Sequence, residues 1–166
     1  MNEITFAGWV IPIAARFRST RQKVAELAPE IPEDAWRLPS PVEGWTYRDV
    51  LAHLAEGDAA VRLVIKAVLE GADTDMRPQN EQRESRNAAI LQRGATHTID
   101  ELISTALQDS EETRLLLSRL NDDDEAVLVI TSRTRPDPIT LGACLTVYHH
   151  DEEHLAQLRE AKMVHS

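Results

Sequence analysis

Three histidines fall in two amphipathic segments that lie far apart in the chain. His150 and His154 belong to "TVYHHDEEHLAQLREA", and His53 belongs to "WTYRDVLAHLAEGD". Residues four apart are neighbours on one face of a helix, so the imidazoles of His150 and His154 can converge on a single ion. The same spacing occurs in the HExxH metalloproteases, but Asp151 after His150 departs from that motif.

Helical periodicity places all three imidazoles on apolar faces. His53 follows Val50 by one turn and precedes Gly57 by one turn, and the small residues there are expected to leave space beside the ring. In the last segment, Asp151 and Glu152 are predicted to point mostly outward. The inward face of that segment is predicted to comprise Ala143, Val147, His150, His154, Leu158 and Ala161.

Spacing alone leaves two interpretations of these histidines open. Each one could be a core residue whose imidazole is hydrogen-bonded to a carbonyl or carboxylate group. Alternatively, the three could be ligands of one metal ion, because a buried imidazole needs polar partners at both nitrogens. One ion supplies such a partner to all three rings and leaves the other nitrogens for hydrogen-bond acceptors. Three imidazoles suit zinc, nickel, copper or iron, with open positions for water or substrate.

Other candidate groups are placed less favourably for chemistry. His149 is turned away from His150 on a helix and is interpreted as a neighbour of the site or a solvated residue. His97 falls in a helix break and His165 near the end of the chain, where ordered ligation is not expected. Glu56 and Glu153 are weak candidates for a general base, because the side chain of each is offset by about one residue position from the direction in which the candidate ligands point.

Apolar periodicity predicts helical regions separated by segments that contain proline or glycine. Thr46 with Asp49, and Thr98 with Glu101, are predicted to form capping boxes at the starts of two helices. The helical regions are 12–27, 46–70, 78–120 (broken in two at "RGATHTID") and 140–163. The basic residues of the first region are predicted to face mostly solvent, namely Arg16, Arg18, Arg21 and Lys23.

These regions bury their apolar stripes most simply as an all-α four-helix bundle, either up-and-down or with one crossover. Residues 126–131 are rich in β-branched side chains and predict a short extended segment, interpreted chiefly as a buried extended connection. As an isolated strand it could instead cover the bundle or pair with a second subunit. The length predicts a single domain over residues 1–166. No Walker sequence and no GxGxxG motif indicates a nucleotide fold.

Composition narrows the class of function further. Asp and Glu outnumber Lys and Arg by 28 to 18, and a net charge of −10 disfavours binding to nucleic acid. Uncharged stretches fall short of the roughly 20 apolar residues of a membrane span, and the short apolar run near the N-terminus lacks the basic start of a secretory signal. Cys144 is the only cysteine and is interpreted as a small buried hydrophobe, so a reducing cytoplasm is expected.

The stretches "EGWTYRDVLAHLAEGD" and "YHHDEEHLAQLREA" resemble the DinB-like superfamily, which includes the N-terminal domain type of mycothiol-dependent maleylpyruvate isomerase. The resemblance covers essentially the whole chain, although the middle matches only in pattern. It implies a four-helix bundle that carries a divalent ion, commonly zinc, nickel or another transition metal such as iron, on His53, His150 and His154. It also implies a homodimer.

The resemblance leaves more than one function open. In the first, favoured slightly, the ion binds a low-molecular-weight thiol such as mycothiol or bacillithiol, and the thiolate attacks a small-molecule substrate in a transferase or isomerase reaction. In the second, the ion activates water for hydrolysis. In the third, the bundle binds a metal or small ligand without catalysis, as a dimeric module.

Overall fold

The computed structural model describes residues 4–131 and 136–163, so the prediction for His165 lies outside the described residues. The helices are α1 (Ile11–Leu27), α2 (Tyr47–Ala55), α3 (Ala59–Glu70), α4 (Arg77–Asn80), α5 (Arg83–Gly94), α6 (Ile99–Leu117), α7 (Leu141–Thr146) and α8 (His150–Met163). Short 3₁₀ turns are η1 (Ala28–Glu30), η2 (Ala35–Arg37) and η3 (Asp122–Ala126), and the strands are β1 (Leu128–Val129) and β2 (Ile139–Thr140).

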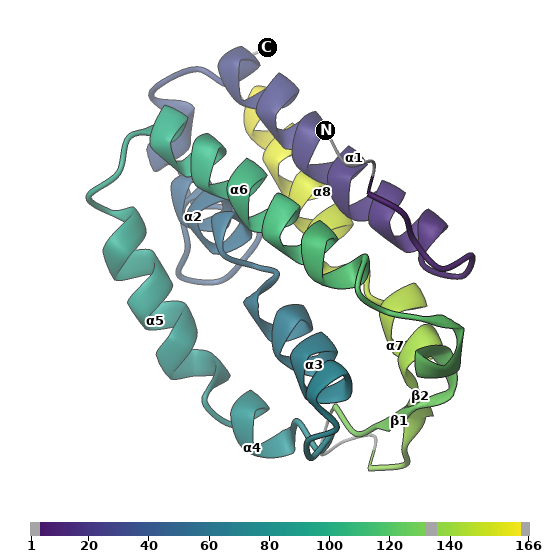
Figure 1. Cartoon of the computed structure of the whole chain (residues 1–166). Coiled ribbons are helices and arrows are strands. Elements are labelled where there is room, and N and C mark those ends of the chain that lie inside the picture. The colour runs from purple at the N-terminus through teal and green to yellow at the C-terminus, as the bar shows by residue number, and fades with distance from the viewer. Residues whose placement is uncertain (1–3, 132–135, 164–166) are drawn as a thin grey trace.

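The predicted all-α four-helix bundle is confirmed. Helix α1 packs on α6 and α8, and α2 packs on the same two helices from another side. Figure 1 shows α1 and α8 running in one direction, and α2, α3 and α6 running in the other. Helix α5 lies outside these four, packs on α2 and carries the chain back between α3 and α6. The predicted break in the third helical region is also confirmed.

Both predicted capping boxes are present. The Thr46 hydroxyl oxygen accepts a hydrogen bond from the backbone N–H of Asp49 at 3.3 Å, and the Asp49 carboxylate accepts one from the N–H of Thr46 at 2.9 Å. Thr98 and Glu101 repeat the arrangement at the start of α6. These reciprocal bonds satisfy N–H groups that have no partner within the helix, and they fix the position where α2 begins. The start of α2 in turn sets the direction of His53.

Two predicted continuous helices are each broken in the structure. The region predicted as one helix over residues 46–70 stops at Ala55 and resumes at Ala59, and the last region stops at Thr146 and resumes at His150. Glycine at position 57 is a poor helix former, and the turn around it is held by buried ion pairs described below. The predicted inward face of the last region is therefore wrong at Ala143 and Val147, which are exposed.

The short extended segment predicted over residues 126–131 is observed as strand β1. It pairs antiparallel with β2 of the same chain, with Leu128 opposite Thr140 and Val129 opposite Ile139. Val129 is buried and Leu128 is exposed, so β1 turns one of its two faces toward the end of the bundle and the other toward solvent. Thr140 then caps α7, because its hydroxyl oxygen accepts a hydrogen bond from the N–H of Ala143.

A layer of buried polar groups divides the apolar interior into two clusters. One cluster gathers residues of α2 and η2 with the later parts of α1 and α8, and the other gathers the start of α1 with α3 and α7. The break at residues 56–58 separates α2, which belongs to the first cluster, from α3, which belongs to the second. The break at residues 147–149 likewise separates α7 in the second cluster from α8 in the first. The buried polar side chains are Thr20, Arg21, His53, Asp58, Asp109, Ser110, Thr113, Asp151 and His154.

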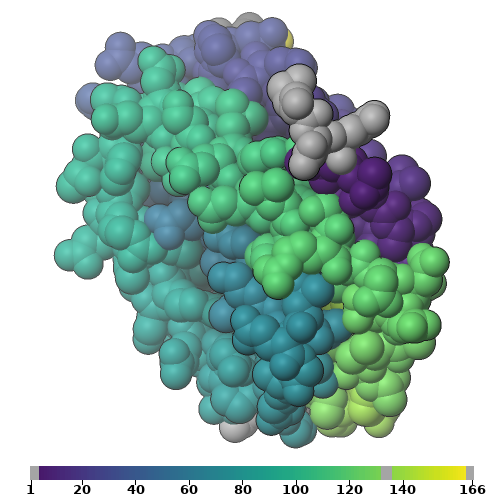
Figure 2. Space-filling model, in the orientation of Figure 1, coloured from purple at the N-terminus to yellow at the C-terminus, as the bar shows by residue number. Residues whose placement is uncertain are grey.

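Helix α8, which carries two of the candidate ligands, buries one face in the bundle, formed by Asp151, His154, Leu155, Leu158 and Ala161. On the face drawn in Figure 2, α1, α3, α5, α6 and the segment around α7 form the surface, and very little of α8 is visible. Cys144 on α7 is half-buried, and burial raises the pKa of its thiol, in keeping with an unreactive side chain. Within residues 4–131 and 136–163, every helix is too short or too polar to span a bilayer.

Candidate metal centre

The imidazoles of His53, His150 and His154 meet at one point inside the bundle. The Nε2 atoms of His53 and His150 are 2.9 Å apart, and those of His154 and His150 are 3.1 Å apart. One ligand atom from each ring lies within 4.8 Å of the other two. Helix α2 supplies the first histidine and the first two turns of α8 supply the others, so segments remote in sequence form a single cluster of nitrogen atoms.

Hydrogen bonding within the cluster does not account for this geometry. Nε2 of His150 faces both of the other Nε2 atoms, yet a neutral imidazole nitrogen either donates one hydrogen bond or accepts one. At least one close contact is therefore left without a shared proton. Zinc–nitrogen bonds of about 2.0–2.1 Å at tetrahedral angles place ligand nitrogens roughly 3.3 Å apart. The observed separations lie close to this value, so the three residues fit one divalent ion.

The electrostatics of the site also suit a cation. Burial, and then the neighbouring rings of His150 and His154, lower the pKa of His53 to about 3. Burial and the ring of His150 lower the pKa of His154 as well. Both imidazoles are therefore neutral at pH 7 and retain the lone pairs that a metal ion requires.

The second nitrogen of each ring has a different environment. The side-chain oxygen of Gln157 lies 2.7 Å from Nδ1 of His154, so it accepts that N–H and leaves the Nε2 lone pair directed at the cluster. Nδ1 of His150 lies 3.6 Å from a carboxylate oxygen of Asp151. Nδ1 of His53 is buried with no hydrogen-bond partner among the described residues, and the ring of Trp45 packs edge-on against this imidazole at 5.1 Å. Trp45 thus supports a candidate ligand.

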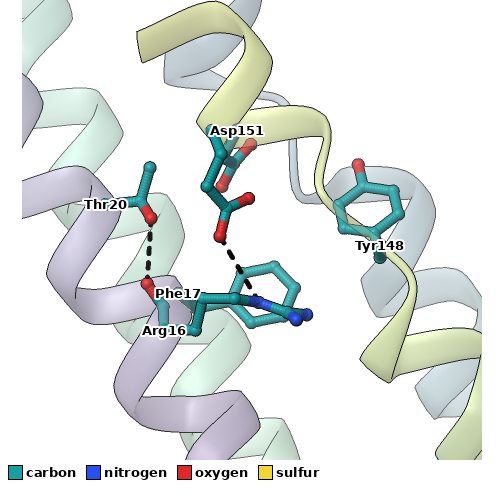
Figure 3. Close-up of a pocket in the computed structure, with 6 residues that line it drawn as sticks. Arg16, Phe17, Thr20, Tyr148 and Asp151 are labelled. Carbon is teal, nitrogen blue, oxygen red and sulfur yellow. Dashed lines mark hydrogen bonds and ion pairs between the residues drawn. The ribbon is translucent and has the colours of Figure 1, made fainter. Parts of the chain in front are cut away.

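Tyr148, in the break before α8, stacks on the ring of His150. The two rings are nearly parallel with centroids 5.8 Å apart, and Phe17 of α1 stacks on Tyr148 at 6.0 Å. The Tyr148 hydroxyl also donates to the carbonyl oxygen of Gly57 at 3.4 Å, which links the two helix breaks. Figure 3 shows the small pocket between α1 and this segment, lined by Arg16, Phe17, Thr20, Tyr148, Asp151 and Glu152.

Two charged residues were placed wrongly by the sequence analysis. Arg21 was predicted to face mostly solvent and Asp151 to point mostly outward, but they are only 1% and 4% exposed. The physical reason is that they neutralise one another, since Nη2 of Arg21 lies 3.3 Å from the Asp151 carboxylate. A signal was present for Arg21, which falls four residues after Phe17 and three before Val24 on the buried face of α1.

The remaining candidates lie outside the cluster. Glu56 forms an ion pair with Arg93 at 2.6 Å, and Glu153 is exposed on α8. His149 is more than half exposed, and His97 lies in the turn between α5 and α6. Among the described residues, none of these groups joins the three imidazoles.

The chain is therefore a helical bundle whose interior holds three convergent imidazoles, an arrangement that fits a metal ion. The family model described as the mycothiol maleylpyruvate isomerase N-terminal domain matches residues 17–159. The chain belongs to this family, which confirms the resemblance to the DinB-like superfamily.

The fold is shared with a solved structure from Bacillus subtilis. That protein, YfiT, is described as a probable metal-dependent hydrolase with an unusual four-helix bundle topology. The likeness covers 99% of this chain and 93% of YfiT, with a TM-score of 0.75 and 19% sequence identity. No curated protein sequence matches the chain.

Proposed function

We propose that the chain is an enzyme whose divalent ion, zinc, nickel or iron, is bound by His53, His150 and His154. The convergence of three Nε2 atoms at 2.9 and 3.1 Å carries this proposal. Three protein ligands leave a position for a small molecule, as in catalytic rather than structural zinc sites. The side chain of His150 is 31% exposed, so a small-molecule substrate can approach the site on this side.

The nucleophile that we propose is the sulfur of a low-molecular-weight thiol, such as mycothiol or bacillithiol. A divalent ion at this site would lower the pKa of a thiol that binds it. Thiol activation of this kind needs no neighbouring carboxylate base, and neither Glu56 nor Glu153 is placed to act as one. The family description names both mycothiol and an isomerase, which supports a thiol-dependent isomerase or transferase reaction.

Hydrolysis is the second candidate, and the likeness to YfiT favours it because that protein is described as a probable metal-dependent hydrolase. In this case the ion would lower the pKa of water instead of a thiol. The chain would then have to remove a proton from water without Glu56, which is paired with Arg93, and without Asp151, which lies 3.6 Å from Nδ1 of His150 but is paired with Arg21. This requirement makes hydrolysis the weaker proposal.

Cobalt substitution separates the two candidates. We expect cobalt(II)-loaded protein to develop a sulfur-to-cobalt charge-transfer absorption when mycothiol or bacillithiol is added, because a thiolate sulfur would enter the open position. The S-methylated form of the same thiol is the matched control and should give no such absorption. If cobalt binds but no free thiol produces the band, thiol activation is refuted, and activated esters and amides become the substrates to assay.

A further inference from the structure

Arg21 is a fully buried cation on α1. This helix packs on α8 but contributes no histidine to the cluster. Its Nη1 group donates a hydrogen bond to the carbonyl oxygen of Leu54, and Nη2 donates one to the Asp58 carboxylate at 2.9 Å. The same Nη2 lies 3.3 Å from the Asp151 carboxylate. One planar guanidinium group thus contacts the end of α2, the turn before α3 and the start of α8.

Two of the contacted residues are chain neighbours of candidate ligands. Leu54 directly follows His53, and Asp151 directly follows His150. The Asp151 carboxylate continues the connection, because its other oxygen lies 3.6 Å from Nδ1 of His150. A displacement of Arg21 would therefore move backbone next to one imidazole and a carboxylate next to the other.

The remaining contacts hold this guanidinium group in one orientation. Asp58 accepts a further hydrogen bond from the Thr113 hydroxyl at 3.2 Å, and Asp109 accepts one from the backbone N–H of Asp58 at 3.1 Å. Asp109 is paired in turn with Arg62 at 2.5 Å. Replacing such a network by apolar residues is often neutral or stabilising, so its presence points to a role other than added stability.

We infer that Arg21 is a positioning residue for the metal centre, and that it fixes the separation of His53 and His150 by holding Leu54 and Asp151 together. This inference rests on the metal centre of the proposed function. It does not depend on which nucleophile the ion activates. Groups that support metal ligands in this way typically change metal affinity by about 10–100-fold.

The test measures cobalt(II) affinity and the cobalt d–d absorption spectrum in Arg21→Lys and Asp151→Asn. A lysine keeps the positive charge, but its single ammonium group cannot reproduce the planar fork that reaches both Leu54 and Asp151. Asp151→Asn keeps the shape of the side chain and removes its charge. We expect both variants to bind cobalt about 10–100-fold more weakly, with altered d–d bands.

Arg62→Gln is the matched control, because it breaks an ion pair with Asp109 in the same network but touches no neighbour of a ligand. It should lower the melting temperature and leave cobalt affinity unchanged. The inference is overturned if Arg21→Lys and Asp151→Asn bind cobalt within about threefold of wild type with the same spectrum. It is also overturned if Arg62→Gln weakens binding equally.

Folding of each variant is checked by circular dichroism. If Arg21→Lys does not fold, Asp151→Asn decides the question alone by the same criteria. Failure of the wild-type protein to bind cobalt would instead refute the metal centre itself, so the two hypotheses fail in different ways.

Discussion

His154→Ala is expected to abolish retention of metal by the purified protein. Wild-type protein prepared without a histidine tag should hold about one ion per chain after dialysis, because three imidazoles bind it together. Removal of one of them should weaken binding by more than about 100-fold, since groups that merely support ligands already contribute about 10–100-fold. Elemental analysis of dialysed protein measures the difference directly.

His149→Ala is the control for this experiment. His149 lies five residues before His154 in the chain and is also an imidazole, but its side chain is 58% exposed and lies outside the cluster. This variant should therefore retain the ion. Full occupancy in His154→Ala, or equal loss in both variants, would contradict the assignment of His154 as a ligand.

Acid is expected to destabilise the metal-free protein through His53. The pKa of His53 is about 3 in the folded chain and about 6.5 in an unfolded one, so between these values the unfolded chain binds more protons. The stability that His53 contributes is therefore present at neutral pH and is lost as the pH falls below about 6.5. The loss should approach about 3 kcal/mol by about pH 4, at 1.36 kcal/mol per unit.

Urea unfolding of chelator-treated protein across this pH range measures the effect. His53→Gln, whose side chain does not titrate, is the reference, because the other ionisable groups are the same in both proteins. As the pH falls, the unfolding free energy of wild type should decrease more than that of His53→Gln. Parallel pH profiles for the two proteins would show that His53 is not held in its neutral form.

The parts of the structure that local sequence encodes were predicted well. Each capping box depends on two residues three apart, so Thr46 with Asp49 identifies the start of α2 without knowledge of the fold. The pair His150 and His154 follows from helical spacing alone. That His53 lies beside them was implied by resemblance to the family and supported by its apolar helix face, and the structure brings the three rings together.

The parts that depend on long-range pairing were not predicted. Arg21 and Asp151 are charged residues whose burial is tolerable only because the fold brings them into contact. They lie in remote segments, so neither segment alone shows that its charged residue has a partner. Gly57 was expected to leave space beside His53, whereas it lies in the helix break, where a side chain would meet Nη2 of Arg21 at 3.4 Å. The break in the last helix was missed for the same reason, because Tyr148 is held there by Phe17 of α1.

These corrections change the picture of how the candidate site is built. Helix α8 begins at His150 itself, so this candidate ligand occupies the first turn, next to Tyr148 and Asp151. His53 lies in the last turn of α2, directly before the other break. Both candidate ligands therefore lie at helix ends that make buried polar contacts with α1.

X-ray absorption spectroscopy of the metal-loaded wild-type protein tests the central claim most directly, since it reports the atoms bound to the ion. We predict three imidazole nitrogens at about 2.0–2.1 Å and at least one further ligand that does not come from the chain. Fewer than three imidazoles, or a coordination sphere completed by another side chain, would contradict the proposed open centre on His53, His150 and His154.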